Sequence, residues 1–478
     1  MIHLPILRAG RPYVSKRRAV VNDVRTAEPV VEVSLANGGL IVRDLARAPD
    51  NRKVLEELSA KQLVDIAGEA ARRFRDDRLP LDEGSDQSLD QYLDQLASTT
   101  GLPVALGSRN VDKICGVLES MASVLAGLTR GLDLSVLDTG WGEEDGRVLS
   151  YLRQSDTLGA ILPNNSPGVH TLWLPAIPLR TPVVLRPGSR EPWTAFRVAQ
   201  AFVAAGCPPE AFGYYPSDYD GATEILMRCG RSLLFGGEDT VGPWRADERV
   251  EIHGPGRSKI LLDDDSAANW PEHLELMLSS IADNGGRSCI NASGVWTAAS
   301  GEEIAAALAQ RMAAIEPKAL ADPQARLAAF PEPRVAHAIS AQIDRTLAAG
   351  GARDLTAEIY GDDARVSQID GCTFLRPTVV LCDDPEHPLA SAEYLFPFVS
   401  IVEIPAPRMP AEIGPSLVVT ALTDDKALQR QLLECPDIDR LNLGPVPTLT
   451  ISWDQPHEGN LFDFLYRRRS FGRARLQA

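Results

Sequence analysis

Short apolar runs alternate with helical segments between residues 157 and 262, and this alternation limits the fold more than any other feature of the chain. Apolar runs lie at 158–162 and 181–185, a helical pattern spans 192–205, and the alternation continues to 250–252. Strands joined by helices over short connections form a parallel sheet with helices on its faces. Ligands bind such sheets at the carboxyl ends of the strands. The sequence therefore predicts a site formed by the loops that follow residues 162, 185, 235 and 252.

A second α/β unit is expected beyond the apolar segment 259–262. The apolar segment 259–262 precedes the acidic stretch 263–266, which offers helix-capping side chains. Helical patterns at 302–315 and 335–348 and strand-like segments at 378–381, 398–404 and 416–422 follow. With 478 residues, and roughly 100–200 residues per domain, the chain is long enough for two or three packed units.

The amino-terminal part is less regular. Residues 30–35 and 40–42 have the apolar character of short strands, and apolar residues recur near a helical period over much of 53–130. The stretch 76–86 is charged and contains a proline and a glycine. We expect an exposed loop there.

Charge and cysteine usage exclude several classes of function. The chain has 48 Lys and Arg against 65 Asp and Glu, so the net charge is 48 − 65 = −17, and such a surface repels phosphate backbones and anionic lipids. No apolar run approaches the roughly 18–20 residues that a spanning helix needs, and residues 1–5 lack the layout of a secretory signal. The seven cysteines have no paired spacing, and no Cys/His cluster has zinc spacing. We expect a cytoplasmic protein with no metal site, no nucleic-acid partner and no membrane attachment.

Cys289 is the candidate nucleophile because of the residues around it. Gly285 and Gly286 precede it and allow the backbone to bend and to approach a ligand closely. If a helix began after Cys289, the positive end of its dipole would lower the pKa of the thiol. A buried structural cysteine is the alternative that the local sequence leaves open.

Segments between about 157 and 455 resemble motifs of the aldehyde dehydrogenase superfamily, and their common order and spacing are more specific than any one of them. The segments are 163–167 for P-W-N-F-P, 181–187 for N-T-V-V-L-K-P, 205–208 for A-G-hydrophobe-P, 235–238 for F-T-G-S, 286–289 for G-Q-x-C, 371–378 for G-(x)n-P-T and 393–397 for E-x-F-G-P. The resemblance implies an α/β fold with a Rossmann-like parallel-sheet cofactor domain, an α/β catalytic domain and a small oligomerisation arm.

The resemblance also implies a division of the chain. The cofactor-binding domain would comprise 1–129 and 157–252, the catalytic domain 253–445, and the oligomerisation elements 130–156 and 446–478. Family members pair by adding strands across such arms. A homodimer or homotetramer is therefore expected.

The resemblance implies covalent catalysis. Cys289 would attack an aldehyde, and the thiohemiacetal would become a thioester when a hydride leaves for a nicotinamide cofactor. Asn165 would direct its side-chain amide, with the backbone N–H of Cys289, at the developing oxyanion. Turn formation before Pro167 is the alternative role of Asn165.

Cofactor residues are also implied, and they are Pro163, Arg186, Ser189, Gly237, Glu238 and Glu393. Arg186 stands at the position of a lysine that holds the cofactor ribose, and Glu393 would bind the ribose on the nicotinamide side. Ser189 replaces a glutamate of many NAD-preferring members, which removes a repulsion against a 2′-phosphate close to Arg186. We expect NAD or NADP, with NADP slightly preferred, although Glu238 would bring an unfavourable charge to the pyrophosphate.

His253 is the main departure from the family pattern, because it stands where a glutamate activates water to hydrolyse the thioester. Branches that lack this glutamate tend to pass the acyl group to coenzyme A, so coenzyme A is a possible co-substrate. Three interpretations of His253 stay open: a structural residue, a general base for water, or a group that activates a thiol or contacts a phosphate. The C-terminal G-G-x-K-x-S-G loop of the family is also missing, and 455–462 stands in its place.

The favoured function is the NAD(P)-dependent interconversion of an aldehyde and an acyl thioester through Cys289, as in the acylating, acyl-CoA reductase branch. The partner would be a small-molecule substrate, either an aldehyde or an acyl-CoA. One alternative is a hydrolytic aldehyde dehydrogenase, in which His253 or a remote carboxylate serves as the base. The other is a catalytically silent cofactor-binding or assembly protein.

Overall fold

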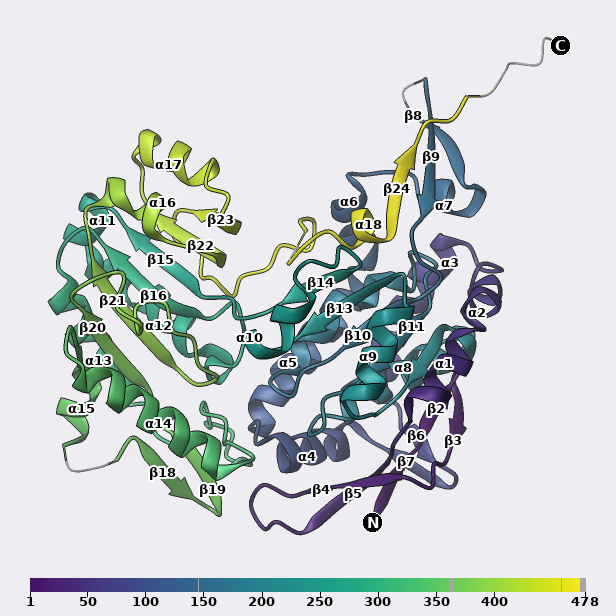
Figure 1. Ribbon diagram of the computed structural model, residues 1–478, viewed down its shortest axis with the longest axis horizontal. Coiled ribbons are helices and arrows are strands. Elements are labelled where there is room, and N and C mark those ends of the chain that lie inside the picture. The colour runs from purple at the N-terminus through teal and green to yellow at the C-terminus, as the bar shows by residue number, and fades with distance from the viewer. Residues whose placement is uncertain (145, 362–363, 457, 473–478) are drawn as a thin grey trace.

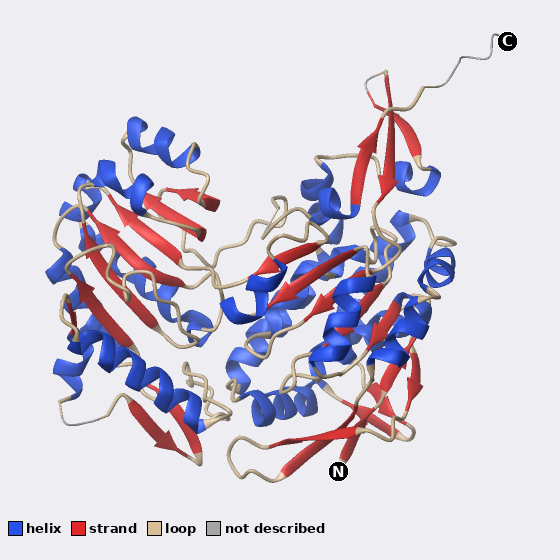
Figure 2. Cartoon of the chain, viewed as in Figure 1, coloured by secondary structure: helices blue, strands red, loops and turns tan. Residues whose placement is uncertain are grey.

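The computed structural model describes residues 1–478 except 145, 362–363, 457 and 473–478. Two lobes lie side by side, each built on a seven-stranded sheet that helices cover, and a three-stranded sheet projects from one lobe (Figure 1). Helices and strands alternate along most of the chain (Figure 2). The predicted α/β class is confirmed.

The first lobe contains the alternating segment that the sequence analysis singled out. Its sheet has the order β14-β13-β10-β11-β12-β2-β3, and the first five of these strands are parallel. The strands are β10 (Leu158–Ile161), β11 (Val183–Arg186), β12 (Phe212–Tyr214), β13 (Arg231–Phe235), β14 (Val250–His253), β2 (Ile6–Arg8) and β3 (Arg11–Tyr13). Helices α8 (Trp193–Ala204), α9 (Tyr219–Arg228) and α10 (Glu238–Val241) connect them. The central strand β10 is buried at all four residues, which explains its continuous apolar run.

The first strand of the second lobe's sheet along the chain is β15 (Ser258–Leu262). This sheet has the order β17-β20-β21-β16-β15-β22-β23 and is parallel except for β17. The other strands are β16 (Ala292–Thr297), β17 (Ala352–Asp354), β20 (Thr378–Cys382), β21 (Phe398–Glu403), β22 (Ser416–Leu422) and β23 (Ile438–Leu443). The helices are α11 (Asp264–Ala268), α12 (Leu274–Ala282), α13 (Gly301–Ala313), α14 (Pro333–Ala348), α15 (Leu355–Tyr360), α16 (Met409–Glu412) and α17 (Lys426–Leu433), and β18 (Val366–Ile369) and β19 (Cys372–Leu375) form a hairpin.

The amino-terminal region corrects two predictions. Residues 40–42 lie in α1 (Gly38–Leu45), because the Asn37 side chain caps that helix by accepting the backbone N–H of Leu40. Residues 76–86 are not an exposed loop: β6 (Leu79–Asp82) and β7 (Ser85–Gln87) form a hairpin whose Leu79 and Leu81 are buried. The remaining elements are β1 (Ile2–Leu4), β4 (Arg18–Asn22), β5 (Pro29–Ser34), α2 (Ala48–Leu55), α3 (Ala60–Asp76), α4 (Leu89–Thr100), α5 (Val104–Glu119), α6 (Met121–Thr129) and α7 (Ser135–Thr139).

A separate three-stranded sheet joins distant parts of the chain. It consists of β8 (Trp141–Glu144), β9 (Arg147–Arg153) and β24 (Tyr466–Arg469), in the order β24-β9-β8. Tyr466 lies opposite Arg153 in the antiparallel pair of β24 and β9, and α18 (Leu461–Leu465) leads into β24. The two segments predicted as oligomerisation elements thus meet in one sheet, which we call the arm. Its role in assembly stays a prediction.

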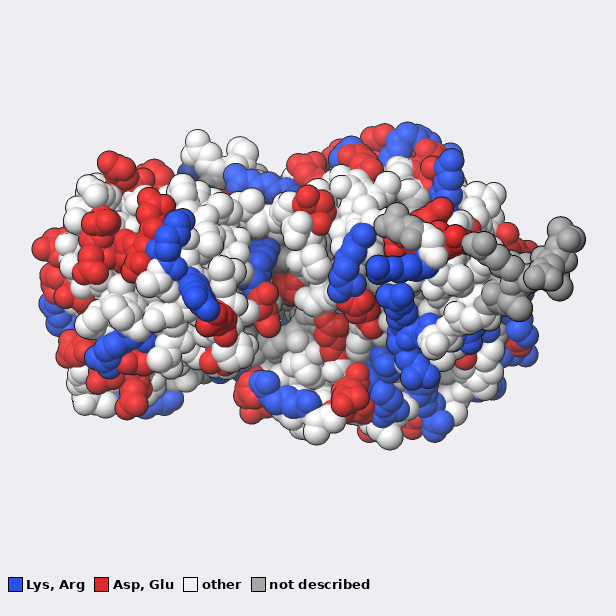
Figure 3. Space-filling view, turned by 90° about the horizontal axis from the view of Figure 1, so that it is seen from above, with Lys and Arg blue, Asp and Glu red and all other residues white. Residues whose placement is uncertain are grey.

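The charges are unevenly distributed over the two lobes. Figure 3 shows the molecule from the end that carries the arm. Many Lys and Arg side chains lie on the lobe with the arm, whereas acidic side chains predominate on the other lobe. None of the helices in the described part of the chain is long and apolar enough to cross a membrane.

Candidate active site

A cavity of about 880 Å³ lies between the lobes. Residues from all four predicted loops, those after residues 162, 185, 235 and 252, line it. Its lining brings together most of the predicted site residues, namely Cys289, Asn165, His253, Pro163, Arg186, Ser189, Gly237 and Glu393. Glu238 is not among the lining residues. Its carboxylate is exposed and lies 2.8 Å from the guanidinium of Arg245, so the structure does not join it to the other predicted residues.

Cys289 lies in the loop between α12 and β16. Gly286, with φ of 65°, lies against residue 396, and a Cβ added to it would lie 2.5 Å from the carbonyl carbon of Phe396. A side chain is therefore excluded at this position on both conformational and steric grounds. The close approach at Gly286 is to the backbone of residues 396 and 397, and an approach to a ligand stays a prediction.

Gly256 packs directly against the backbone of Cys289. A Cβ added to Gly256 would lie 1.9 Å from the carbonyl oxygen of Cys289. That oxygen also accepts a hydrogen bond from Ser258 Oγ at 2.9 Å. The start of β15 and the nucleophile loop are thus in direct backbone contact.

Asn291, which was not predicted from the sequence, stabilises the loop around Cys289 by hydrogen bonds from its side chain to nearby backbone atoms. Its Nδ2 donates to the carbonyl oxygens of Ser280, Ile281 and Asp283 at 2.9–3.2 Å. Its Oδ1 accepts the backbone N–H of Ser288 at 2.9 Å. The signal available in the sequence was a polar amide between Ile290 and the apolar start of β16.

Arg287 ties the nucleophile loop to the first lobe. Its guanidinium donates to the carbonyl oxygens of Thr100, at 3.1 Å, and of Ala329. The residue is 4 % exposed, and burial lowers the pKa of its guanidinium to about 10. A buried cation needs such acceptors, so Arg287 acts as a clamp rather than as part of the chemistry.

Asn165 is also bonded to this loop. Its Nδ2 donates to the carbonyl oxygen of Arg287 at 2.9 Å. Its Oδ1 is buried and has no hydrogen-bond partner among the described residues. The amide group has two hydrogens, and this bond uses one of them.

The environment of the Cys289 thiol differs from the expectation. Residues 292–297 form strand β16 rather than a helix, so no helix dipole acts on the sulfur. Burial raises the pKa of the Cys289 thiol well above its ordinary value, and the charges of Glu458 and Glu393 raise it further, whereas Lys113 opposes them. The predicted lowering of this pKa is therefore wrong, and the resting form is the neutral thiol.

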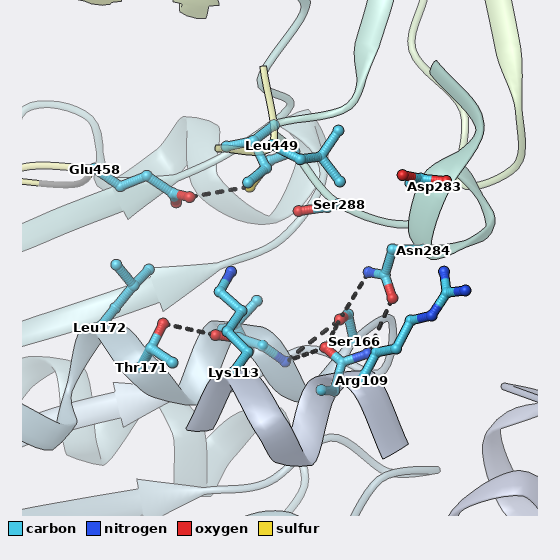
Figure 4. Close-up of a pocket in the computed structure, with 15 residues that line it drawn as sticks. Arg109, Lys113, Ser166, Thr171, Leu172, Asp283, Asn284, Ser288, Leu449 and Glu458 are labelled. Carbon is cyan, nitrogen blue, oxygen red and sulfur yellow. Dashed lines mark hydrogen bonds between the residues drawn. The ribbon is translucent and has the colours of Figure 1, made fainter. Parts of the chain in front are cut away.

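Glu458 connects Cys289 to His253. The thiol donates to Glu458 Oε1 at 3.4 Å (Figure 4), and Glu458 Oε2 lies 3.5 Å from His253 Nδ1. The side chains of His253 and Glu458 are only 6 % and 7 % exposed. The sequence analysis missed Glu458, because it lies in the segment 455–462, where the family motif is absent.

His253 has a defined orientation at the end of β14. Its ring stacks on Phe235, with centroids 4.4 Å apart and planes 13° apart. Its Nε2 is buried without a hydrogen-bond partner among the described residues. The ring lines the large cavity, so it lies between Glu458 and the predicted cofactor site.

The residues on the cofactor side of the cavity fit a dinucleotide. The guanidinium of Arg186 donates to the carbonyl oxygen of Ser217 at 3.0 and 3.2 Å, and burial lowers its pKa. Ser189 and Arg190 line the same region, together with apolar side chains of α9. Cofactor sites commonly have volumes of about 300–1,000 Å³. The cavity volume, its basic groups and its apolar lining therefore suit an NAD-type cofactor.

Glu393 faces the same cavity from the second lobe. It accepts the backbone N–H of Arg257, and burial raises the pKa of its carboxyl to about 7. No group of three or more His, Cys, Asp or Glu in the described part of the chain could hold a metal ion.

A smaller cavity of about 200 Å³ also adjoins Cys289. Its lining comes from α5, from the loop after β10, from the nucleophile loop and from the segment that carries Glu458 (Figure 4). This cavity contains Arg109 and Lys113, which the sequence analysis did not consider. It is the candidate pocket for the substrate.

Comparison with known proteins identifies the family of the chain. The sequence model of the aldehyde dehydrogenase family matches residues 15–406, most of the chain. The chain belongs to the aldehyde dehydrogenase family. This membership confirms the predicted NAD(P)-dependent aldehyde oxidoreductase class. No curated protein sequence matches the chain.

Solved structures of aldehyde dehydrogenases share the fold. The aldehyde dehydrogenase KauB from Pseudomonas aeruginosa is 15 % identical, with a TM-score of 0.74 over 98 % of this chain and 96 % of that one. An indole-3-acetaldehyde dehydrogenase in complex with NAD⁺ is 16 % identical, with a TM-score of 0.74 over 98 % and 96 %. An NADP dependent enzyme from E. coli is 15 % identical, with a TM-score of 0.74 over 98 % of both chains. The aldehyde dehydrogenase fold is thereby confirmed.

Proposed function

We propose that this aldehyde dehydrogenase oxidises an aldehyde to the free carboxylic acid through a thioester on Cys289. The observation that supports this function best is the carboxylate of Glu458, which contacts both the Cys289 thiol and the His253 ring. The overall reaction converts an aldehyde, NAD(P)⁺ and water into a carboxylic acid, NAD(P)H and a proton. The hydrolytic alternative assigns the base to His253 or to a remote carboxylate, and we assign the remote carboxylate to Glu458.

The first step is attack by sulfur on the carbonyl carbon. Because burial favours the neutral thiol, Glu458 removes the thiol proton as the carbon–sulfur bond forms. The second amide hydrogen of Asn165 is available to the oxygen that becomes negative. Two donors fixed before the reaction stabilise such an oxyanion without reorganisation, and the backbone N–H of Cys289 is the second one in this proposal.

Pro163, Arg186, Ser189, Gly237 and Glu393 would hold the nicotinamide cofactor. When bound, it supplies the acceptor for the hydride that leaves the thiohemiacetal. Ser189 carries no charge and has Arg186 and Arg190 beside it in the cavity, and this environment supports a preference for NADP over NAD. Comparison of kcat/KM for the two cofactors tests the preference.

Hydrolysis of the thioester requires a base that is free of its proton. His253 lies 3.5 Å from Glu458 and faces the large cavity, so it can pass the first proton outward. The Glu458–His253 pair then accepts a proton from the attacking water as its oxygen bonds to the thioester carbon. The carbon–sulfur bond breaks, the pair returns the proton to the sulfur of Cys289, and the acid leaves. In this proposal His253 acts as part of the general base, which is one of its three interpretations.

Acylation of coenzyme A is the second candidate, and the absence of the family glutamate at residue 253 favours it. In that reaction the coenzyme A thiol, rather than water, would attack the same thioester. Glu458 and His253 would accept the thiol proton. The two candidates therefore share every step up to the thioester.

A product assay separates them. Aldehyde and NAD(P)⁺ are incubated with the enzyme, with and without coenzyme A, and the products and the Cys289 peptide are analysed by mass. We expect free acid without coenzyme A, and we expect His253→Gln to slow acid formation and to increase the acyl-Cys289 fraction. His337→Gln, on the exposed face of α14, is the matched control.

Other outcomes contradict the proposal. Acyl-CoA as the product, with no acid when coenzyme A is left out, would establish the acylating reaction. Cofactor binding without turnover of any aldehyde or acyl-CoA would support the silent alternative.

A further inference from the structure

Two cationic side chains from one helix line the small cavity next to Cys289. Arg109 and Lys113 lie four residues apart on α5, so they project from the same face of that helix. In Figure 4 the Lys113 ammonium points from α5 into the space below Glu458 and Leu449. The Arg109 side chain rises beside Asn284.

The two cations have no close carboxylate partner, although the charge of Glu458 partly compensates that of Lys113. Within the described residues, neither side chain makes a hydrogen bond or an ion pair. The two carboxylates of the cavity lining have other contacts: Asp283 lies 3.5 Å from the guanidinium of Arg326, and Glu458 contacts Cys289 and His253. An unpaired cation in a partly dehydrated cavity is unfavourable.

Lys113 is the more deeply placed of the two. Arg109 is exposed, whereas Lys113 is partly buried, and burial lowers the pKa of its ammonium group. A bound anion next to Nζ would offset this cost with a charge-assisted hydrogen bond. The cavity is thus favourable for a negatively charged ligand at a site that also contains the nucleophile.

We propose that the substrate is a short aldehyde with a carboxylate at its far end, which Lys113 and Arg109 bind while the aldehyde group faces Cys289. This inference rests on the proposed oxidation of an aldehyde. A volume of about 200 Å³ is below the roughly 300–1,000 Å³ of sites for larger ligands, which limits the substrate to a few carbons.

The lining also favours a carboxylate over a phosphate. Two cations and two carboxylates line the cavity, so a single negative charge is easier to accommodate than a double one. Neutral aldehydes of the same length lack the group that Lys113 would bind. They bring no negative charge to Lys113 beyond that of Glu458.

Matched pairs of substrates test the inference. Steady-state kinetics compare 4-oxobutanoate with butanal and 5-oxopentanoate with pentanal, for the wild type and for Lys113→Met. We expect kcat/KM of the wild type to favour the carboxylated member by about 10- to 100-fold, as for a hydrogen bond to a charged group. Lys113→Met should remove most of this preference, and Lys113→Arg, which keeps the charge, should retain it.

Lys61→Met, on the exposed face of α3, is the matched control and should keep the preference. Equal kcat/KM for charged and neutral members in the wild type would overturn the inference. So would a preference that Lys113→Met leaves intact. An aldehyde with a terminal phosphate as the best substrate would overturn the choice of carboxylate.

A binding measurement makes the test independent of turnover. Calorimetry compares glutarate with its neutral diamide; we expect glutarate alone to bind, and Lys113→Met to weaken it by at least about 10-fold. Suppose that glutarate binds, that this binding depends on Lys113, and that the enzyme oxidises no aldehyde. That result would refute the proposed function but support the anion site. Oxidation of aldehydes without glutarate binding would refute the anion site alone.

Discussion

At the scale of single residues, the site is organised around a carboxylate that contacts the nucleophile. Glu458 receives the thiol hydrogen of Cys289 and lies next to His253. A negative charge beside a thiol stabilises the protonated form. Burial and the charge of Glu458 therefore both favour the neutral form of the Cys289 thiol.

The first prediction concerns the pH dependence of Cys289. Burial raises the pKa of its thiol, and Glu458 adds to this increase through its charge and its hydrogen bond. Removing the charge with Glu458→Gln makes the thiolate less unfavourable, so the pKa should fall and thiolate should form at lower pH. We expect the midpoint of iodoacetamide alkylation of Cys289 to move down by about one pH unit.

Peptide mass analysis between pH 6 and 10.5 follows the alkylation of Cys289 separately from that of the other cysteines. Glu358→Gln, an exposed carboxylate on α15, should leave the midpoint where it is. An unchanged or higher midpoint in Glu458→Gln would show that its charge does not act on the sulfur.

The sequence predicted the part of the site that short motifs encode. Cys289, Asn165 and His253 each occupy a recognisable segment, and the structure places all three on one cavity. Glu458 could not be found in this way, because its position depends on the path of the chain from the second lobe back to the first. The direction of the thiol pKa was also missed, since a strand and not a helix follows Cys289.

At the scale of elements, the loop 283–291 is held by bonds to backbone atoms. Asn291 satisfies three carbonyl oxygens at the end of α12 and just after it, and Arg287 bonds to carbonyl oxygens outside the loop. The position of the nucleophile is therefore set by side chains that do not take part in the chemistry.

The second prediction follows from this arrangement. Asn291→Ala leaves the carbonyl oxygens of Ser280, Ile281 and Asp283 without their donor, at a cost of about 1 kcal/mol or more for each buried group. We expect the free energy of unfolding, measured by urea denaturation, to fall by about 2–4 kcal/mol, and kcat to fall with it.

Asn269→Ala is the control, since the Asn269 amide makes one exposed bond, to the carbonyl oxygen of Asp265 at 3.0 Å. It should change the free energy of unfolding by about 0.5 kcal/mol or less. Equal losses in the two variants would refute the special role of Asn291.

Helices and strands were predicted correctly where the apolar pattern extends over a long segment of the chain, and wrongly where that segment is short. The alternation between 157 and 262 predicted a parallel sheet with helices on its faces, and the structure has that sheet. Residues 40–42 form too short a run to distinguish a helix from a strand, and the cap at Asn37 decided the outcome. In 76–86 the charged residues hid the alternation of Leu79 and Leu81, both of which face the core.

At the scale of the whole molecule, the arm offers a surface for assembly. Strand β24 is an edge strand, and Arg467, Arg468 and Arg469 on it are exposed. Edge strands have unpaired backbone groups that can join a second sheet. A basic strip on a chain with net charge −17 is complementary to the acidic surface of another copy.

The third prediction concerns this strip. We expect the wild type to have a mass in solution of two or four times 51.8 kDa by light scattering after size exclusion. Combining Arg467→Glu, Arg468→Glu and Arg469→Glu should lower that mass, because it replaces attraction between copies by repulsion. Arg334→Glu, on α14, is the control with an exposed arginine elsewhere, and an unchanged mass in the triple variant would exclude the strip from the interface.

The segment that delivers Glu458 to the sulfur continues through α18 directly into β24. Glu458, the proton acceptor that we propose, and the edge strand β24 of the arm are therefore close neighbours along the chain. If copies of the chain associate through β24, the interface also restricts the position of the Glu458 carboxylate in the same chain. Dilution that dissociates the oligomer would then lower kcat while both lobes stay folded.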